Sequence, residues 1–304
     1  MDPASASIRR ARPLLGTFVE IGVSGMPCFD RDLAFAAAFD AVAKVHRLMS
    51  FHEHDSDLSR LNRAAAQHPV DVDPWTFEVL QASYALHLRS DRAFDVTVAP
   101  ELQDIGLLPR PQVRQPARAE VIPMADSVEL LPGDRIHFRH PDVRIDLGGI
   151  AKGFAVDRAI EALKTVGAPS GFVNAGGDFA AFGPCSEPVH IRDPRAPQRL
   201  LCRVEVSNEA LASTGLGFDP LRSATAAGSA IIDPRTRCRA EGIAGATVRT
   251  NCCMIADALT KIVMIDADAT SALLEHYAAS ALLVRSDGEV LASPNWKGTA
   301  SLAA

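Results

Sequence analysis

Residues 144–157 read RIDLGGIAKGFAVD, and this stretch decides how the chain is expected to fold. The apolar residues Val143 to Leu147 predict a strand, two glycines follow, and a helix is expected from Gly149 to about Val166. A strand that passes through glycines into a helix exposes backbone N–H groups to an anion. Lys152 adds a positive charge in the first turn, and Asp146 can accept hydrogen bonds from a ligand. The spacing fits neither a dinucleotide-binding fingerprint nor a P-loop. Close packing of a strand against a helix is therefore an alternative explanation of the glycines.

Helix and strand patterns are mixed along the rest of the chain. Asp30 to Met49 places apolar residues near one helical face, and Asp73 can cap a helix that begins at Pro74. Cys253 to Met264 is expected to form a buried helix. Strands are expected at Thr17–Val23, Gly171–Asn174, Phe179–Phe182, Val189–Arg192, Leu201–Val206, Ala230–Ile232 and Ala244–Val248, with hairpins turned at Gly133-Asp134 and Asp287-Gly288. Because strands and helices do not alternate strictly, the predicted fold class is α+β, with mixed or antiparallel sheets and packed helices.

Prolines mark the best candidate boundary in the chain. Residues 107–123 contain Pro109, Pro111, Pro116 and Pro123, which favours a loop or linker. We therefore expect an N-terminal lobe over residues 1–110, a proline-rich loop over 111–126 and a C-terminal lobe over 127–304. One integrated domain made of both parts is also compatible with a chain of 304 residues.

Composition and charge limit the possible functions. The chain has 47% hydrophobic and 22% charged residues, as expected for a globular protein. Its net charge is −6 and its 31 Lys and Arg are scattered, so we expect no nucleic-acid partner. No apolar run is long enough for a transmembrane segment, and the strand-like residues after Arg9-Arg10 argue against an export signal, so a cytoplasmic location is expected. The six cysteines contain no C-x-x-C pair and are expected to be free thiols.

Two further segments combine carboxylates with turn residues. Asn174 to Asp178 reads NAGGD, which fits a ligand-binding turn or a plain hairpin. Ala230 to Arg235 reads AIIDPR, an apolar strand that ends in Asp-Pro. Asp233 either belongs to a site or bonds nearby backbone where the proline stops the strand.

A third segment places polar residues on an apolar helix. Met254 to Lys261 reads MIADALTK, in which Asp257, Thr260 and Lys261 lie on one face. A carboxylate in such a helix needs a partner, a metal ion or water. Its oxygens suit Mg²⁺, which prefers hard ligands and often also contacts phosphate.

Together these segments resemble the ApbE family of FAD:protein FMN transferases, over nearly the whole chain from about Leu15 to Lys261. A single segment of this kind would be weak evidence, whereas seven or eight in the family's order are highly specific. The matching segments are LGT at 15–17, MSFHEHDSDLSRLN at 49–62, FDVTV at 94–98, DLGGIAKGFAVD at 146–157, NAGGD at 174–178, ASTG at 212–215, IIDPRT at 231–236 and ADALT at 256–260.

The resemblance implies an α+β fold with FAD in a cleft between two lobes. It implies an enzyme that transfers FMN from FAD to a threonine hydroxyl of an acceptor flavoprotein and releases AMP. It also implies Mg²⁺ near the pyrophosphate, held by a backbone oxygen near Gly149 and by Asp257 and Thr260. The residues that it implies for FAD binding are Leu15, Phe51, Asp95, Val96, Thr97, Asp146, Lys152 and Ile231.

The chain departs from the family pattern at three positions. Ala230 stands where relatives commonly carry a histidine considered a catalytic base, Lys261 where they carry a threonine, and Arg237 where they carry a glycine. We take Asp257, Lys261 and Asp233 as candidate catalytic residues. Asp233, a metal-bound water or a nearby carboxylate could serve as the substitute base. Lys261 either offsets the pyrophosphate charge in place of a metal ion or merely pairs with a carboxylate. The alternative functions are an FAD pyrophosphatase and a non-catalytic FAD-binding protein, the latter favoured by Ala230.

Overall fold

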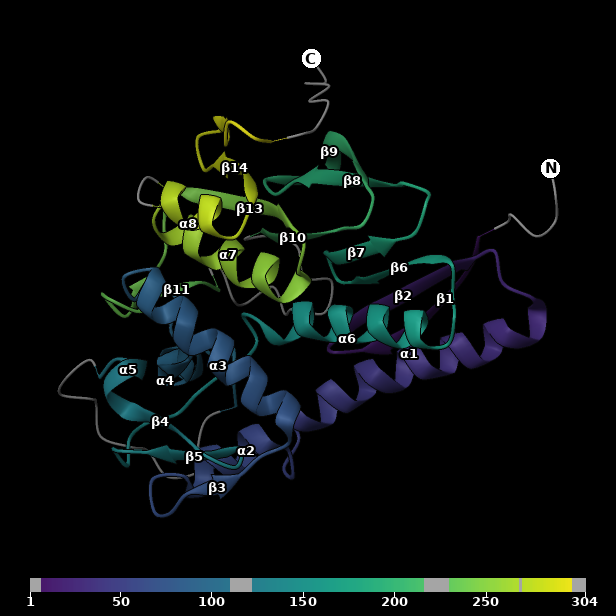
Figure 1. Cartoon of the computed structure of the whole chain (residues 1–304). Coiled ribbons are helices and arrows are strands. Elements are labelled where there is room, and N and C mark those ends of the chain that lie inside the picture. The colour runs from purple at the N-terminus through teal and green to yellow at the C-terminus, as the bar shows by residue number, and fades with distance from the viewer. Residues whose placement is uncertain (1–6, 110–121, 216–229, 268–269, 297–304) are drawn as a thin grey trace.

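A large antiparallel sheet lies at the centre of the computed structural model, which describes residues 7–109, 122–215, 230–267 and 270–296. On one face of this sheet α6 (Ala151–Thr165) and α7 (Cys253–Ile265) pack, with α1 (Cys28–Met49) beside α6, as Figure 1 shows. Within the described ranges eight strands pair antiparallel in the order β1 (Ile8–Leu14), β2 (Thr17–Ser24), β6 (Ser170–Ala175), β7 (Asp178–Phe182), β10 (Glu209–Gly215), β13 (Ile243–Thr250), β14 (Ser280–Arg285) and β15 (Val290–Ala292).

Smaller units surround the large sheet. Phe172 and Phe179 of the large sheet pack with Ile191 and Val204 of a separate hairpin, so this hairpin covers part of the sheet. The hairpin consists of β8 (Glu187–Asp193) and β9 (Ala196–Val206). The other elements are α2 (Asp57–Ala64), β3 (Val70–Asp71), α3 (Pro74–Arg89), the 3-10 helix η2 (Val96–Val98), α4 (Ala99–Asp104), α5 (Met124–Ser127), β4 (Val128–Leu131), β5 (Arg135–Phe138), β11 (Ile232–Asp233), β12 (Cys238–Arg239) and α8 (Ser271–His276).

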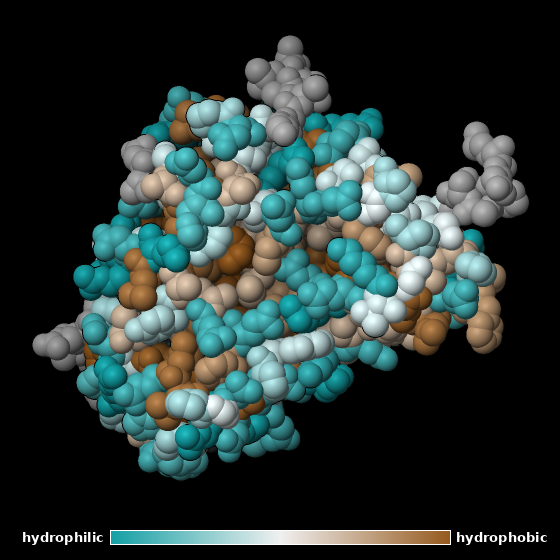
Figure 2. Space-filling view, viewed as in Figure 1, coloured by the Kyte–Doolittle hydropathy of each residue, from teal (hydrophilic) through white to brown (hydrophobic). Residues whose placement is uncertain are grey.

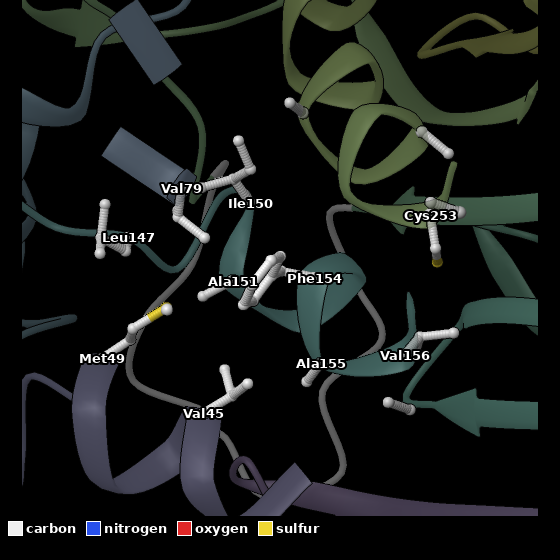
Figure 3. Close-up of a cluster of buried hydrophobic side chains, with 14 of the residues drawn as sticks. Val45, Met49, Val79, Leu147, Ile150, Ala151, Phe154, Ala155, Val156 and Cys253 are labelled. Atoms are coloured by element: carbon white, nitrogen blue, oxygen red, sulfur yellow. The ribbon is translucent and has the colours of Figure 1, made fainter. Parts of the chain in front are cut away.

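One hydrophobic core contains residues from before and after the predicted proline-rich loop. Figure 3 shows Val45 and Met49 of α1, Val79 of α3 and Phe154 of α6 around the beginning of α6. Phe154 is buried and also makes an edge contact with the Trp75 ring of α3. The core therefore fixes the first turns of α6, which follows the predicted loop, against α1 and α3, which precede it. Most of the predicted proline-rich loop, residues 110–121, lies outside the described residues.

The predicted α+β class is confirmed, and several helices begin where their capping residues predict. Asp73 accepts the Trp75 N–H at 2.9 Å at the start of α3. Figure 2 shows polar and apolar side chains intermixed on the face in view, with apolar ones also near the start of α1, where Phe29 and Leu33 are exposed. Among the described residues, no helix has both the length and the apolar character that crossing a membrane requires.

The strand predicted over Val143 to Leu147 is wrong. Its apolar residues do alternate inward, but the backbone of this segment joins no strand ladder in the described part of the chain. Asn62 takes the place of a neighbouring strand, because its side chain accepts the Ile145 N–H at 2.8 Å and donates to the Ile145 carbonyl at 2.9 Å. The Asp146 N–H donates to the Val96 carbonyl at 2.8 Å. The segment thus has the burial of a strand without its hydrogen bonds.

Candidate functional site

The candidate site forms where the first turns of α6 lie against α7. Gly153 permits this contact, because a Cβ there would lie 2.2 Å from the Cys253 carbonyl oxygen and 2.8 Å from Asp257 Cβ. The Gly153 N–H also donates to Asp257 Oδ2 at 3.1 Å. Close helix packing therefore explains this glycine, and the same packing holds the carboxylate of α7 against the beginning of α6.

Two lysines and two aspartates gather at this junction, and we call them the charge cluster: Lys152, Asp178, Asp257 and Lys261. The side chains of Asp178 and Asp257 are 2% and 0% exposed, so neither carboxylate reaches bulk water. Lys152 Nζ lies 3.3 Å from Asp178 Oδ2 and 4.0 Å from Asp257 Oδ1. Lys261 Nζ donates to Asp257 Oδ1 and, at 3.0 Å, to the Asp257 carbonyl oxygen. The opposite charges compensate one another, as buried ions require.

Burial and mutual attraction set the protonation states of the charge cluster. Burial disfavours the charged form of Lys152, but the Asp178 and Asp257 carboxylates outweigh it and raise the pKa of Lys152. Burial acts against ionised Asp257, yet Lys152 and Lys261 outweigh it, so the pKa of Asp257 is lowered. Burial together with the Asp257 carboxylate raises the pKa of Asp178 to about 6. At neutral pH Lys152 can therefore present positive charge to a ligand.

The positive groups are the accessible part of the charge cluster. Lys152 keeps 32% of its side chain exposed and Lys261 keeps 13%, whereas the carboxylates lie beneath them. Lys152 is in the first turn of α6, where the helix dipole adds partial positive charge. An anion that approaches this helix end therefore meets two ammonium groups first.

Gly149 and Thr260, two predicted metal ligands, also lie at this junction. A Cβ on Gly149 would be 3.9 Å from both Cγ and Cε of Lys261, so the lysine side chain passes alongside this glycine. The buried Thr260 hydroxyl lies 2.7 Å from the Asp257 carbonyl oxygen and 2.7 Å from the Thr214 hydroxyl. Thr214 belongs to the ASTG segment and connects α7 to β10.

Asp95, Val96, Thr97 and Asp146, all predicted to bind FAD, are joined in one group of loops. Asp95 Oδ1 accepts the Thr97 N–H at 2.7 Å, and the Val96 carbonyl accepts the Asp146 N–H at 2.8 Å. Burial raises the pKa of Asp146, and the Gly148 N–H at 3.0 Å from Asp146 Oδ2 partly offsets this effect. These loops adjoin the charge cluster, because Phe94 Cε2 would lie 3.7 Å from a Cβ on Gly149.

Two residues support the Asp95–Thr97 turn that sequence reasoning did not assign to it. His87 Nδ1 lies 3.0 Å from the Phe94 carbonyl and 3.3 Å from Asp95 Oδ2 in the buried interior. Arg237, with φ of 60°, donates to the Thr97 carbonyl at 3.0 Å and lies 3.3 Å from Glu101. The positive φ explains why relatives carry glycine there. The Arg237 charge is thus matched by Glu101.

The remaining predicted site residues lie on other elements. Asp233 is on β11, where its Oδ1 accepts from the Arg235 N–H at 2.9 Å and from Arg235 Nε at 3.1 Å. Ile231 is buried next to it. Leu15 is in the β1–β2 turn with φ of 55°, Phe51 follows α1, and both pack partly against the main core. Their roles in binding and catalysis stay predictions.

Sequence reasoning also missed the role of Asp157. In the structure Asp157 Oδ1 accepts the Cys253 N–H at 2.9 Å, and its Oδ2 accepts the Met254 N–H at 2.8 Å. Asp157 therefore caps α7 from α6. Asp178 carried a signal in the NAGGD segment, but its position in the charge cluster depends on contacts between β7, α6 and α7.

Comparison with known proteins identifies the family. A sequence model of the ApbE family matches residues 15–284. An FAD:protein FMN transferase of Vibrio cholerae is 27% identical over 87% of this chain and 83% of that protein. One from Rhodobacter capsulatus is 27% identical over 93% of this chain and 56% of that protein. The crystal structure of an ApbE protein from Thermotoga maritima matches with a TM-score of 0.84 and 26% identity, over 95% of this chain and 97% of that chain. The flavin transferase ApbE from Vibrio cholerae matches with a TM-score of 0.79 and 25% identity, over 95% and 98%. This chain belongs to the ApbE family.

Proposed function

We propose that this chain is an FAD:protein FMN transferase, which moves FMN from FAD to a threonine hydroxyl of an acceptor protein. The observation that carries the proposal is the pair of ammonium groups of Lys152 and Lys261 beside the N-terminal end of α6. The FAD pyrophosphate is an anion, and ammonium groups beside the positive end of a helix dipole attract such anions. Relatives aligned over most of the chain carry this activity in their names.

The proposed reaction is a phosphoryl transfer. The threonine oxygen attacks the phosphorus of the FMN half, in line with the oxygen that bridges the two phosphates. The bond from that phosphorus to the bridging oxygen breaks, AMP leaves with the oxygen, and the hydroxyl proton passes to a base or to water. Lys152 and Lys261 hold the pyrophosphate and offset the charge that develops on AMP. The products are AMP and a protein that carries FMN through a phosphoester.

This chain differs from its relatives in the group that could accept the threonine proton. Ala230 supplies no base, and the predicted substitute, Asp233, is paired with Arg235 at 3.1 Å. Arg235 competes with a substrate hydroxyl for the same carboxylate oxygen. This pairing favours a second candidate function, an FAD-binding protein without turnover. Incubation with FAD alone tests the pyrophosphatase alternative. Release of free FMN and AMP would indicate a pyrophosphatase, whereas FAD that stays intact would exclude it.

The transferase proposal is tested by mass spectrometry of a candidate acceptor co-expressed with the full chain. We expect FMN on one acceptor threonine, and we expect the adduct to disappear in Asp257→Ala. Asp40→Ala is the matched control, because Asp40 is exposed on α1. Circular dichroism of both variants checks that they are folded. An acceptor that stays unmodified while FAD remains tightly bound contradicts the transferase and supports the binding protein.

Magnesium was predicted beside Asp257, and the residues present do not fit an ion at that point. Asp257 Oδ1 already accepts the Lys261 ammonium, and Oδ2 accepts the Gly153 N–H. A protonated lysine has no lone pair for Mg²⁺. Charge compensation in the proposed reaction therefore rests on the two lysines.

An acceptor flavoprotein with a target threonine and a cytoplasmic location complete the proposal. The acceptor follows from the reaction, since FMN transfer to protein needs a second polypeptide. Fractionation of cells that express the full chain checks the location, and recovery in an exported fraction contradicts it.

A further inference from the structure

We propose that the Lys261 ammonium takes the place of a magnesium ion in this chain, so that FAD pyrophosphate is bound without a divalent metal. The inference rests on the proposed FAD site and specifies the cation that serves it. Three features of the α6–α7 junction carry it: the occupied carboxylate of Asp257, the engagement of the other predicted metal ligands, and the spare hydrogen-bonding capacity of Lys261.

The Asp257 carboxylate has its partners already. Oδ1 accepts a hydrogen bond from Lys261 Nζ and lies 4.0 Å from Lys152 Nζ. Oδ2 accepts the Gly153 N–H at 3.1 Å. Asp257 is completely buried, so it has no exposed lone pair that faces water. A divalent ion on Oδ1 would have to displace the lysine that now neutralises this carboxylate.

The other two predicted metal ligands are engaged in the same way. The Lys261 side chain passes Gly149, since a Cβ on that glycine would lie 3.9 Å from Lys261 Cγ and Cε. The Thr260 hydroxyl lies 2.7 Å from the Asp257 carbonyl oxygen, and the Thr214 hydroxyl is 2.7 Å from it on another side. The place between Gly149 and Asp257 is therefore taken by the lysine itself.

Lys261 can still bind a phosphate oxygen from this position. An ammonium group has three N–H donors, and the structure uses one for Asp257 Oδ1 and one for the Asp257 carbonyl. Within the described part of the chain the third donor has no partner and is left for a ligand, and 13% of the side chain is exposed. Lys152 supplies the second positive charge from α6. The two ammonium groups are the exposed part of the charge cluster, so they are the cations that a pyrophosphate meets first.

A purely structural role for Lys261 makes a different prediction. If the lysine only neutralised Asp257, pyrophosphate binding would still need magnesium. We instead expect the FAD affinity of the wild type to be independent of magnesium. We expect the variant without Lys261 to need magnesium for tight FAD binding. Thr is the informative replacement because it offers a hydroxyl oxygen and frees Asp257 for a metal ion.

The experiment measures FAD affinity by calorimetry in EDTA and in excess Mg²⁺, using the full chain. We expect less than about a twofold difference between the two conditions for the wild type, and about a tenfold or larger gain with Mg²⁺ for Lys261→Thr, the size expected for one charge-assisted bond. Lys164→Thr is the matched control, because Lys164 is exposed near the other end of α6. Binding of Mn²⁺ followed by electron paramagnetic resonance, in the presence of FAD, gives a second readout. Lys261→Thr should gain a bound ion that the wild type and Lys164→Thr lack.

Each other outcome overturns a specific part. Wild-type FAD binding that weakens tenfold in EDTA overturns the lysine-for-metal inference and leaves the proposed function intact. Equal behaviour of wild type and Lys261→Thr in both conditions, with no additional Mn²⁺ bound, also overturns the inference. A folded wild-type protein that binds FAD neither with nor without Mg²⁺ overturns the proposed function, and the inference with it.

Discussion

The pKa of Asp178 reports the electrostatics of the charge cluster, and it can be measured through the pH dependence of stability. Its pKa is raised from 3.8 to about 6, chiefly by burial and then by the Asp257 carboxylate. At pH values between these two pKa values, the folded protein therefore keeps a proton on Asp178 that the unfolded chain has lost. Because the unfolded state then binds fewer protons, the free energy of unfolding falls as pH rises through this window.

We expect Asp178→Asn to remove about 1–3 kcal/mol of that fall, because an amide does not titrate. Urea unfolding at both ends of the pH window measures the change. The groups that act on Asp178 are Lys152, Asp257, Lys261 and Cys253. Burial also raises the pKa values of Asp146 and Asp157. These two residues likewise make the free energy of unfolding fall as pH rises, and Asp178→Asn retains their contribution. An identical pH dependence in wild type and Asp178→Asn contradicts this account.

Gly153 is the residue that sets the distance between α6 and α7. A Cβ there would lie 2.2 Å from the Cys253 carbonyl, which is backbone and cannot rotate away. We expect Gly153→Ala to lower the free energy of unfolding by about 1–3 kcal/mol and to weaken FAD binding. Gly149→Ala is the comparison for stability, since its Cβ would have ordinary contacts at 3.7 and 3.9 Å. Equal stability of the two variants would mean that the helices are not packed as described.

At the scale of elements, α7 depends on a cap that comes from another helix. Its own N-cap residue, Cys252, makes no side-chain cap bond, and Asp157 of α6 accepts two N–H groups of the first turn. We expect Asp157→Ala to cost about 1–2 kcal/mol of stability, measured by urea unfolding. Glu161→Ala on the exposed side of α6 should cost less than about 1 kcal/mol, because its pair with Arg158 is a surface ion pair. Similar losses in both variants would refute the capping role.

The β11–β12 hairpin is connected to the Asp95–Thr97 turn by one side chain. Arg237 donates to the Thr97 carbonyl at 3.0 Å and pairs with Glu101 at 3.3 Å. We expect Arg237→Ala to lower the free energy of unfolding by about 1–3 kcal/mol, because buried acceptors lose their donor. Arg237→Lys should not restore it, since lysine lacks the planar fork that reaches several acceptors. Chemical unfolding of both variants checks this, and full stability of Arg237→Lys counts against it.

At the scale of the whole molecule, features with local causes could be predicted from the sequence. The cap at Asp73 and the hairpin turn at Gly133-Asp134 depend on neighbouring residues only, and both are found. Asp257, Lys152 and Lys261 could be named because they recur in recognisable segments. Their mutual contacts could not, because they arise from packing between α6, α7 and β7.

The failures come from partners that are distant in sequence. Val143 to Leu147 has the inward alternation of a strand, but its backbone bonds to Asn62, which is 83 residues from Ile145. Strand β1 was not predicted because arginines interrupt its pattern. Two of these, Arg10 and Arg12, lie over the rings of Phe35 and Phe39, so β1 packs through cation–π contacts rather than apolar side chains.

The most direct test of the whole account is the preference for FAD over riboflavin, which has the flavin ring but no phosphate. We expect the folded full chain to bind FAD more tightly, and Lys152→Met to lose about tenfold to a hundredfold of that preference, the size of a charge-assisted hydrogen bond. Riboflavin affinity should stay unchanged, because riboflavin has no phosphate for Lys152 to bind. A preference for FAD that survives Lys152→Met in full would contradict pyrophosphate binding at the α6–α7 junction.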